Sequence, residues 1–487
     1  MSTLLTVFPH LGLIAMVMSL SHLLPLAVSL AHGDGAAGAF VASMAVNFVA
    51  GCTMWITTRR RQRQRELTAR DGILLVVLAW CGGAAFATLP LLLVIPGLTF
   101  TDAYFETVSG LTTTGATVLS NLDVMEPSIN FWRCLLVWLG GMGLIVLAVA
   151  ILPLLGIGGR QIFRAETPGP MKDAKLTPRI TETAKGLWVV YALISIACAM
   201  AYRLAGMSWF DAVVHMFSTM GLGGFSSHDA SFGYWDSPAI EAVAILFMLI
   251  ASVNFGTHFL ALRTRSAVPY RADPELGWCI GIMLGSCVVI ALYLLLQGAY
   301  PDFRSALRFA SFNVISIATT TGYANTDFNL WPIFAPMWML FLSSFVSCSG
   351  STGGGIKMIR AQLLYLQVYR EFIKLLHPSA AITTRIGGQV IENKILFSVL
   401  AFLFIYVASI VVMTLLLMAS GLDELTSFSA VVASINNTGP GLNKVGPATT
   451  FAVLSDFQTW VCTFAMLIGR LELFTVLIIF TPVFWRK

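Results

Sequence analysis

Four short segments combine glycine with small polar residues in a pattern that suits the coordination of a cation. They read TVSGLTTTGATVL, MFSTMGLGGFSSH, NVISIATTTGYAN and AVVASINNTGPGL, at residues 107–119, 216–228, 313–325 and 430–442. Glycine tolerates backbone conformations with positive φ, so successive carbonyl groups can be turned in one direction. Carbonyl oxygens arranged in this way can replace the hydration shell of a desolvated cation.

The triplet that ends at the equivalent glycine of each segment is the predicted ion-binding unit. The triplets are Thr113, Thr114 and Gly115; Leu222, Gly223 and Gly224; Thr320, Thr321 and Gly322; and Asn437, Thr438 and Gly439. The hydroxyl groups of Thr113, Thr114, Thr320, Thr321 and Thr438 are expected to hold these loops by hydrogen bonding. A single Thr-Thr-Gly sequence is also common where transmembrane helices pack together, so the prediction depends on all four.

A short apolar segment precedes each triplet and is expected to form a half-helix. The four segments are Ala103–Thr113, Phe210–Leu222, Phe303–Thr320 and Leu425–Asn437. Apolar segments of about 10–14 residues are too short to cross a bilayer and are often re-entrant. Their C-terminal ends carry a partial negative charge that would face a cation. Non-helical backbone at membrane depth is tolerated only where it is buried or lines a water-filled cavity, so four such loops predict a pore.

The composition places these loops in a membrane. Of the 487 residues, 57% are hydrophobic and only 11% are charged, whereas soluble domains have about 25% charged residues. A helix needs about 20 apolar residues to cross the hydrocarbon core. Ten such stretches occur, the eighth of them interrupted: Leu11–Leu30, Ala36–Thr57, Gly72–Ile95, Trp132–Leu155, Leu187–Ala205, Ala239–Leu262, Leu276–Gln297, Ile333–Ser349, Ile395–Ser420 and Phe457–Phe480.

The spans and half-helices form a fourfold internal repeat. Gly115, Gly224, Gly322 and Gly439 are separated by 109, 98 and 117 residues, and each follows a half-helix and precedes another span. Such self-similarity is the signature of a repeat architecture. We therefore expect an all-α polytopic membrane protein with pseudo-fourfold symmetry around one pore. Its expected units are an N-terminal two-helix extension over residues 1–66 and repeats over 67–185, 186–272, 273–390 and 391–487.

The positions of Lys and Arg predict the orientation, because these residues accumulate in cytoplasmic loops. Of the 29, 23 fall on alternate loops of the ten-span arrangement, at 59–70, 160–185, 263–271, 357–394 and the C-terminal end. Both termini are therefore expected on the cytoplasmic side. We assign fourteen acidic and five basic residues to the opposite side, Glu106 and Arg133 among them. An acidic outer face would concentrate cations, although a simple lack of bases in translocated loops gives the same pattern.

Residues 343–355 are expected to interrupt the second span of the third repeat. Ten of these thirteen residues, SSFVSCSGSTGGG, are Ser, Thr or Gly, and each glycine destabilises a helix interior by about 1 kcal/mol relative to Ala. The sequence is not a phosphate-binding P-loop, because Ile356 precedes Lys357 and Met358 follows it. A flexible intramembrane loop and a passive kink filled by neighbouring helices both fit this composition. The glycines of the segment are Gly350, Gly353, Gly354 and Gly355.

Arg470 lies thirteen residues into the last predicted span. A charge at such depth costs at least about 2.5–3.5 kcal/mol and marks a candidate functional site. We expect Arg470 to face the pore or the interrupted segment, where it would raise a barrier to cations or hold a closed state by binding free carbonyl groups. The alternative is a structural pair with Glu472, which is disfavoured because residues two apart on a helix do not face each other.

The four loops, together with SCSGSTGGGIK at 347–357 and GRLELF at 469–474, make the whole chain resemble the bacterial TrkH potassium transporters of the TrkH/KtrB/HKT superfamily. The resemblance implies a K⁺-selective pore built from four covalently joined units in one protomer, usually a homodimer, with residues 343–355 as the gate. Na⁺-conducting relatives tend to carry Ser at the first filter glycine, so Gly115 favours K⁺. The second loop, with Leu222, and the fourth, with Asn437, depart from the Thr-rich pattern, so the symmetry is only approximate.

The resemblance also implies a partner and a location. TrkH proteins bind a ring of TrkA-type cytosolic subunits whose NAD(H), ATP or ADP occupancy controls conduction. We expect that partner on the basic face formed by Arg59–Arg70, Arg160–Lys185 and Lys357–Lys394, in the bacterial cytoplasmic (inner) membrane. Topology and anionic lipid are alternative roles for these bases. The chain carries no nucleotide motif, so we expect no cofactor on it and K⁺ only as the transported ion.

Enzymatic functions find little support in the sequence. The seven His show no H-x-x-x-H spacing, and neither G-x-S-x-G nor C-x-x-C occurs. A proton-pumping subunit would need acidic residues within its spans, and Glu472 alone lies deep in one. A K⁺ symporter coupled to H⁺ or Na⁺, and a less selective Na⁺/K⁺ pathway, remain alternatives to a gated channel.

Overall fold

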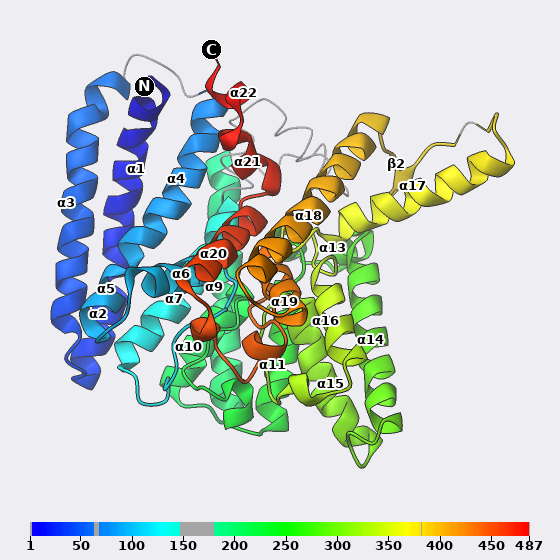
Figure 1. Cartoon of the computed structure of the whole chain (residues 1–487), viewed down its shortest axis with the longest axis horizontal. Coiled ribbons are helices and arrows are strands. Elements are labelled where there is room, and N and C mark those ends of the chain that lie inside the picture. Colours follow the sequence, from blue (N-terminus) through cyan, green and yellow to red (C-terminus); the bar gives the residue numbers. More distant parts are fainter. Residues whose placement is uncertain (1, 63–67, 147–179, 381, 487) are drawn as a thin grey trace.

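The protein is almost entirely helical in a computed structural model that describes residues 2–62, 68–146, 180–380 and 382–486 (Figure 1). The N-terminal extension comprises α1 (Ser2–Ser21), α2 (Leu23–His32) and α3 (Ala37–Gln62), and it stands at one edge of the molecule. Helices α1 and α3 cross closely at two glycines. A Cβ atom on Gly12 would lie 2.6 Å from Gly51 O, so only glycine fits there.

The remaining helices recur four times in the same order, as a first helix, a half-helix, a loop and a second helix. The first group is α4 (Ala69–Ala87), α5 (Leu89–Val94), α6 (Phe100–Leu111) and α7 (Pro127–Val146). The second is α9 (Ile180–Ala205), α10 (Trp209–Gly221), η3 (Ser231–Tyr234), α11 (Pro238–Ala251) and α12 (Phe255–Thr264), followed by α13 (Val268–Ala272).

The third group is α14 (Leu276–Leu296), α15 (Phe303–Ala318), η4 (Phe328–Leu330), α16 (Phe334–Ser343) and α17 (Met358–Leu376). A two-residue antiparallel pair, β1 (Arg385–Ile386) and β2 (Gln389–Val390), follows and pairs Arg385 with Val390. The fourth is α18 (Asn393–Ala419), α19 (Glu424–Ile435), η5 (Asn443–Val445), η6 (Phe451–Val453), α20 (Asp456–Arg470), α21 (Leu473–Leu477), η7 (Ile478–Phe480) and α22 (Pro482–Trp485). Helix α17 and the chain that directly follows it extend away from the body, whereas α18 returns to it (Figure 1).

The four half-helices α6, α10, α15 and α19 begin in the same way. In each, the N-cap side chain accepts a hydrogen bond from the backbone N–H three residues later, at 2.9–3.1 Å. Such caps satisfy donors that a helix start leaves free. The caps are Thr99, Ser208, Asp302 and Asp423. The predicted half-helices are therefore confirmed to within a few residues.

The prediction of continuous spans over Ala239–Leu262 and Phe457–Phe480 is wrong. Within the described residues, six helical segments are long and apolar enough to cross a membrane, or up to eight if two bent pairs are counted. The pair α11 and α12 bends by 90°, and the pair formed by α20 and Leu473–Phe480 bends by 117°. The interrupted eighth stretch contains only the ten-residue α16, and residues 147–155 of the fourth lie outside the described residues.

The additional breaks are compensated by other parts of the chain. After α11, Ser252 O accepts from Cys348 N at 3.2 Å, and Phe255 N donates to Gly350 O at 3.0 Å. At the second break, Glu472 adopts a φ of 68°. Free backbone groups within a membrane require such partners. Local sequence carries no proline at either break, so these bends follow from tertiary contacts.

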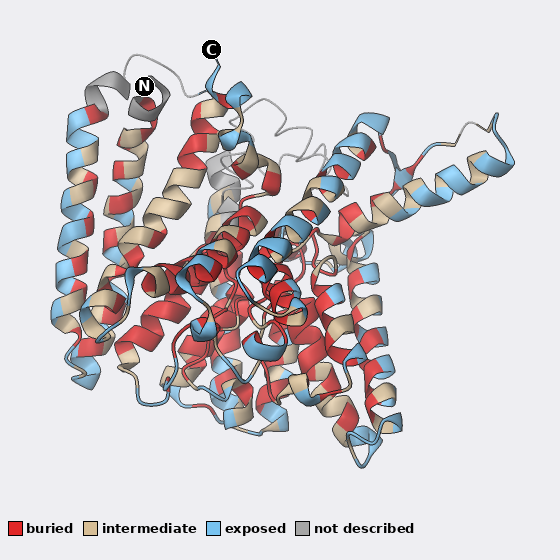
Figure 2. Ribbon diagram, viewed as in Figure 1, coloured by how far each residue is buried: buried red, intermediate tan, exposed pale blue. Residues whose placement is uncertain are grey.

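The buried residues gather where the half-helices and loops meet, as Figure 2 shows. The outer helices expose large apolar side chains such as Phe404, Leu292 and Val49. Exposed apolar faces on long helices suit contact with lipid. The described ends of the chain lie at the same end of the molecule (Figure 1).

Candidate functional site

The four predicted triplets share one backbone conformation. Their first residues, Thr113, Leu222, Thr320 and Asn437, are left-handed with φ of 54°, 53°, 61° and 54°. Their glycines Gly115, Gly224, Gly322 and Gly439 have φ of 82°, 30°, 89° and 97°. Non-glycine residues rarely adopt the left-handed region, and its fourfold recurrence indicates a common structural demand.

The triplets contact one another in a closed ring. A Cβ atom on Gly115 would lie 2.9 Å from Gly223 O, and one on Gly439 would lie 2.8 Å from Thr114 O. A Cβ on Gly224 would strike Thr321 O, and one on Gly322 would strike Thr438 O. Each filter glycine thus lies against the carbonyl group of the second triplet residue in the next repeat. The contacts run from the first repeat to the second, third and fourth, and from the fourth back to the first.

Most carbonyl groups of the ring are available to a ligand. Gly223 O accepts from Phe225 N at 2.6 Å, whereas the other triplet carbonyls accept no hydrogen bond from the described residues. Buried carbonyls are nearly always paired. A run of unused carbonyls in four neighbouring loops therefore suits the coordination of a desolvated cation.

The threonine hydroxyls fulfil their expected role only in part. Thr114 Oγ1 bonds Thr112 Oγ1 at 2.7 Å, Thr321 Oγ1 bonds Thr319 Oγ1 at 2.8 Å, and Thr320 Oγ1 accepts from Gly354 N at 2.7 Å. Thr113 and Thr438 were expected to do the same, but their buried hydroxyls have no partner. The loops are held instead by backbone bonds from the second triplet residue to the half-helix residue five positions earlier, at 2.8–3.0 Å in all four repeats.

The segment between α16 and α17 lies directly against the half-helix ends and filter loops. Thr352 Oγ1 donates to Met220 O at 3.0 Å, and a Cβ on Gly353 would lie 3.2 Å from Thr319 O. A Cβ on Gly354 would strike Asn436 O. The predicted break of the helix is confirmed, and Gly350 and Gly355, both with φ of 74°, shape the segment. These contacts with the second, third and fourth repeats fit both a gate and a kink filled by neighbouring helices.

Arg470 reaches this segment from the end of α20. Its Nη1 donates to Thr352 O at 2.8 Å and its Nη2 to Gly140 O at 3.3 Å, and the side chain is buried. Arg470 was expected to lie midway along a straight span; it lies at the bend instead. Glu472 pairs with Arg360 at 2.9 Å and not with Arg470, so the structural-pair alternative is wrong.

A buried acidic residue that the sequence did not point to, Glu275, binds both the middle of this segment and the start of α17. Glu275, at the N-cap of α14, accepts from Ser349 N at 2.9 Å, Ser349 Oγ at 3.2 Å and Ile359 N at 3.0 Å on one oxygen. Burial raises the pKa of Glu275 to about 8, against the lowering effect of these bonds. In the sequence, Glu275 looked like any charge of a cytoplasmic loop.

Glu106 and Arg133 were assigned to the acidic outer side, yet both are buried. Arg133 Nη2 lies 2.7 Å from Glu106 Oε1, with both side chains at most 1% exposed. Glu106 lies on α6 and Arg133 on α7, so the pair sits within the first repeat beside its loop. Only their separation by 27 residues, with a loop between, could have suggested a pair.

A histidine cluster ties the loop after α10 to the loop after α6 and to the start of α10. His228 Nδ1 lies 2.5 Å from Asp123 Oδ1, and His228 Nε2 lies 3.2 Å from Asp211 Oδ1. Asp123 follows the first filter loop, and Asp211 begins α10. Burial opposes protonation of His228, but the hydrogen bonds to Asp211 and Asp123 outweigh it and raise the pKa of His228. His215, predicted to be a packed polar residue, is buried and bonds Asp211 O and Ser226 Oγ, each at 2.9 Å.

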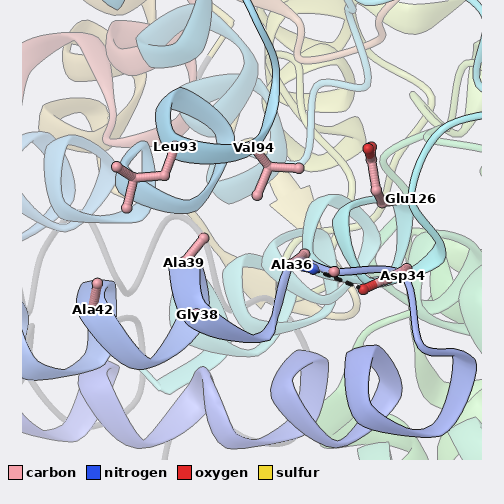
Figure 3. A pocket seen from close by; sticks show the side chains of 9 residues that line it. Asp34, Ala36, Gly38, Ala39, Ala42, Leu93, Val94 and Glu126 are labelled. Atoms are coloured by element: carbon pink, nitrogen blue, oxygen red, sulfur yellow. Dashed lines mark hydrogen bonds between the residues drawn. The ribbon is translucent and has the colours of Figure 1, made fainter.

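A separate cavity of about 470 Å³ lies between the N-terminal extension and the first repeat (Figure 3). Asp34 and Glu126 line it together with Leu93, Val94 and small residues of α3, and no triplet residue does. In the described ranges, no three His, Cys, Asp or Glu side chains lie close enough to hold a metal ion. Of the predicted partner face, residues 63–67, 160–179 and 381 lie outside the described residues, whereas Lys357–Lys394 includes the extended α17.

An all-helical membrane protein in which four re-entrant loops close a ring belongs to the class of transport proteins with a channel-like architecture. The family model of TrkH, described as "Cation transport protein", matches residues 37–487, and the chain therefore belongs to the TrkH family. This membership places it among transporters and not enzymes.

Relatives resemble the chain along nearly its whole length. The Trk system potassium uptake protein TrkH of Halomonas elongata is 46% identical over 479 residues, and the protein of the same name from Escherichia coli K12 is 44% identical over 477; each alignment covers 98% of both chains. The crystal structure of the potassium transporter TrkH from Vibrio parahaemolyticus matches with a TM-score of 0.91 at 44% identity, over 99% of this chain and 100% of that one.

Proposed function

We propose that the chain takes up K⁺ through the ring of four triplets. The observation that carries this proposal is the closed cycle of glycine-to-carbonyl contacts around unused oxygens. The relatives named as potassium uptake proteins support K⁺ as the ion. Glycine is present at all four equivalent positions, including Gly115.

The twelve triplet residues form the selectivity filter in this proposal. Their backbone oxygens replace the water of the ion, and the half-helices direct their partially negative C-terminal ends at it. The side chain of Asn437 adds support to the ring, because its Nδ2 donates to Thr114 Oγ1 and to Met466 O, both at 3.0 Å. The fourth loop is thereby fixed to the first.

The segment at 343–355 acts as the gate, with Gly350, Gly353, Gly354, Gly355 and Arg470 as its working residues. Its contacts with Met220, Thr319 and Asn436 hold it across the inner ends of three filter loops. Arg470 retains it there by binding Thr352 O. A buried guanidinium next to the ion path also opposes the passage of cations.

The chain is further proposed to be a homodimer in the bacterial inner membrane, with both termini in the cytoplasm. The distribution of Lys and Arg and the common end of the two termini support this orientation. A TrkA-type partner carrying NAD(H), ATP or ADP would bind the basic face, and no cofactor is needed on this chain. Neutralising Arg370 and Lys374 on the extended α17, together with Arg385 on β1, should weaken partner binding in a pull-down, and unchanged binding would reject this face.

The proposal is tested by ion flux into liposomes that contain the purified chain. K⁺ and Rb⁺ should pass well above Na⁺, and equal Na⁺ flux would overturn the proposed selectivity. Imposing a pH or Na⁺ gradient without a K⁺ gradient tests the symport alternative. A gated channel gives no net K⁺ accumulation under these conditions, whereas a symporter does.

A further inference from the structure

The residue nine positions before each filter glycine differs in chemistry among the four repeats. These residues are Glu106, His215, Asn313 and Ala430. We call the two or three residues after each filter glycine the outer limb of that loop. The residue nine positions before the glycine lies on the half-helix, which runs beside the outer limb. Its side chain can therefore hydrogen-bond the outer limb.

Three of the four residues bond their own outer limb. Glu106 accepts from Thr117 Oγ1 at 2.9 Å and from Val118 N at 3.0 Å. His215 Nε2 bonds Ser226 Oγ at 2.9 Å, and Asn313 Nδ2 donates to Asn325 Oδ1 at 2.6 Å. In the fourth repeat, where Ala430 has no polar group, the adjacent Ser429 Oγ accepts from Leu442 N at 2.9 Å. The same task is thus carried out by four different groups.

Among the described residues, the first repeat alone uses an ion pair for this task. Arg133 Nε donates to Glu106 Oε1 at 2.8 Å, and Arg133 Nη2 donates to Thr117 Oγ1 at 3.1 Å. Arg133 Nη1 donates to Asn130 Oδ1 at 3.0 Å. The pair is neutral as a whole, so its contribution is geometric and not an attraction for cations. Charge-assisted bonds are stronger and more directional than neutral ones, which makes this limb the most firmly held of the four.

The same guanidinium reaches the second repeat. Arg133 Nη1 also donates to Ser226 O at 3.3 Å, and Arg133 Cζ lies 4.5 Å from the centre of the Phe225 ring. Phe225 and Ser226 directly follow Gly224, and the loop of Gly224 lies against Gly115 of the neighbouring first loop. One ion pair therefore fixes the outer limbs of two adjacent loops against each other.

We propose that Glu106, held by Arg133, is a positioning residue that determines ion selectivity by fixing the outer limbs of the first and second filter loops. The proposal rests on the proposed function of the four triplets. A carbonyl cage distinguishes K⁺ from Na⁺ by the number and placement of its oxygens. If two of the four outer limbs are held less firmly, the carbonyl oxygens can move closer to Na⁺, which is smaller than K⁺. The K⁺/Na⁺ flux ratio should therefore fall while K⁺ still passes.

The test measures K⁺ and Na⁺ fluxes of purified variants in liposomes, together with their melting temperatures. Glu106→Gln keeps the size of the side chain but removes its charge, and Glu106→Asp keeps the charge but shortens its reach. Both should lower the K⁺/Na⁺ flux ratio by about three- to tenfold while K⁺ still passes. Thr117→Val, a nearly isosteric and milder change, should lower it by about two- to threefold and covers the case that the Glu106 variants do not fold.

Glu241→Gln is the matched control. Glu241 is also a buried carboxylate, held by Arg308 at 2.7 and 2.8 Å, but it bonds no filter loop in the described part of the chain. It should lower the melting temperature and leave the flux ratio unchanged. Two outcomes would overturn this inference alone. In the first, folded Glu106 and Thr117 variants keep the K⁺/Na⁺ flux ratio of the unmodified protein. In the second, the Glu241 variant loses as much selectivity as they do. Equal K⁺ and Na⁺ flux in the unmodified protein would overturn both this inference and the proposed function.

Discussion

Replacing Gly115 by Ser tests the ring of triplets most directly. Gly115 has a φ of 82°, and a Cβ atom there would lie 2.9 Å from Gly223 O and 3.1 Å from Gly224 N. The serine must therefore either push the second loop outward or move its own backbone. Either response displaces carbonyl groups on two adjacent sides of the ring.

The size of the effect follows from two contributions. The left-handed conformation costs a non-glycine residue about 1–2 kcal/mol. Relieving the contact with Gly223 requires a shift of the backbone, for which strain of about 1 kcal/mol is a reasonable scale. The total is about 2–3 kcal/mol, and a part of about 1.4 kcal/mol expressed in the ion-binding geometry would lower the K⁺/Na⁺ flux ratio about tenfold.

The assay compares K⁺ and Na⁺ flux into liposomes for the Gly115→Ser variant and for a Gly97→Ser control. Gly97 lies in the same repeat with a φ of 77°, but a Cβ there meets nothing within 4 Å. The control thus carries the conformational cost without the contact, and it should retain selectivity. The same flux ratio in the Gly115 variant and the unmodified protein would refute the reasoning, as would an equal loss in the Gly97 control.

Three further predictions concern charged groups outside the filter. Arg470→Ala should raise flux without any partner by at least about tenfold, because the charge-assisted bond to Thr352 O in the gate segment and the bond that ties the same guanidinium to Gly140 O on α7 are both lost. Lower flux from a folded variant would count against the gate. Burial raises the pKa of Glu275 to about 8 from an ordinary 4.5, so the folded protein binds an extra proton between these values and its stability falls as pH rises through them. Glu275→Gln should flatten this dependence of melting temperature between pH 5 and pH 8.5, and an unchanged slope would contradict it. The raised pKa of His228 means that its bonds to Asp123 and Asp211 stabilise the fold below pH 6.5 and lose that effect as pH rises past the raised value. His228→Gln should therefore lower the melting temperature more at pH 6 than at pH 9, and equal losses would argue against charged pairing.

The repeat and its half-helices were predictable because they depend on local sequence. The short apolar segments and the glycines at equivalent spacing are visible in the sequence, whereas the caps Thr99, Ser208, Asp302 and Asp423 were identified only in the structure. Backbone positions that need a positive φ often carry glycine, so many of them can be recognised in the sequence. This is why the triplet positions could be named from sequence.

The missed features depend on contacts between distant residues. The bend before Phe255 is stabilised by Gly350, and the depth of Arg470 was misjudged because the turn at Glu472 has no glycine or proline. Glu106 and Arg133 were assigned to the outer face because they fall between spans on the side opposite to the loops rich in Lys and Arg. A single sequence carries no information on which distant charges meet in the interior.

Carrying all four corners of the ring on one polypeptide changes how the pore can evolve. When four identical subunits build a pore, one altered codon appears at every corner at once. Here each corner mutates alone, and the other three preserve function while it drifts. That freedom accounts for Glu106, His215, Asn313 and Ala430 at places that identical copies would have to keep alike. It also makes the corners separately accessible to an engineer, who can weaken one side of an ion cage and leave three intact.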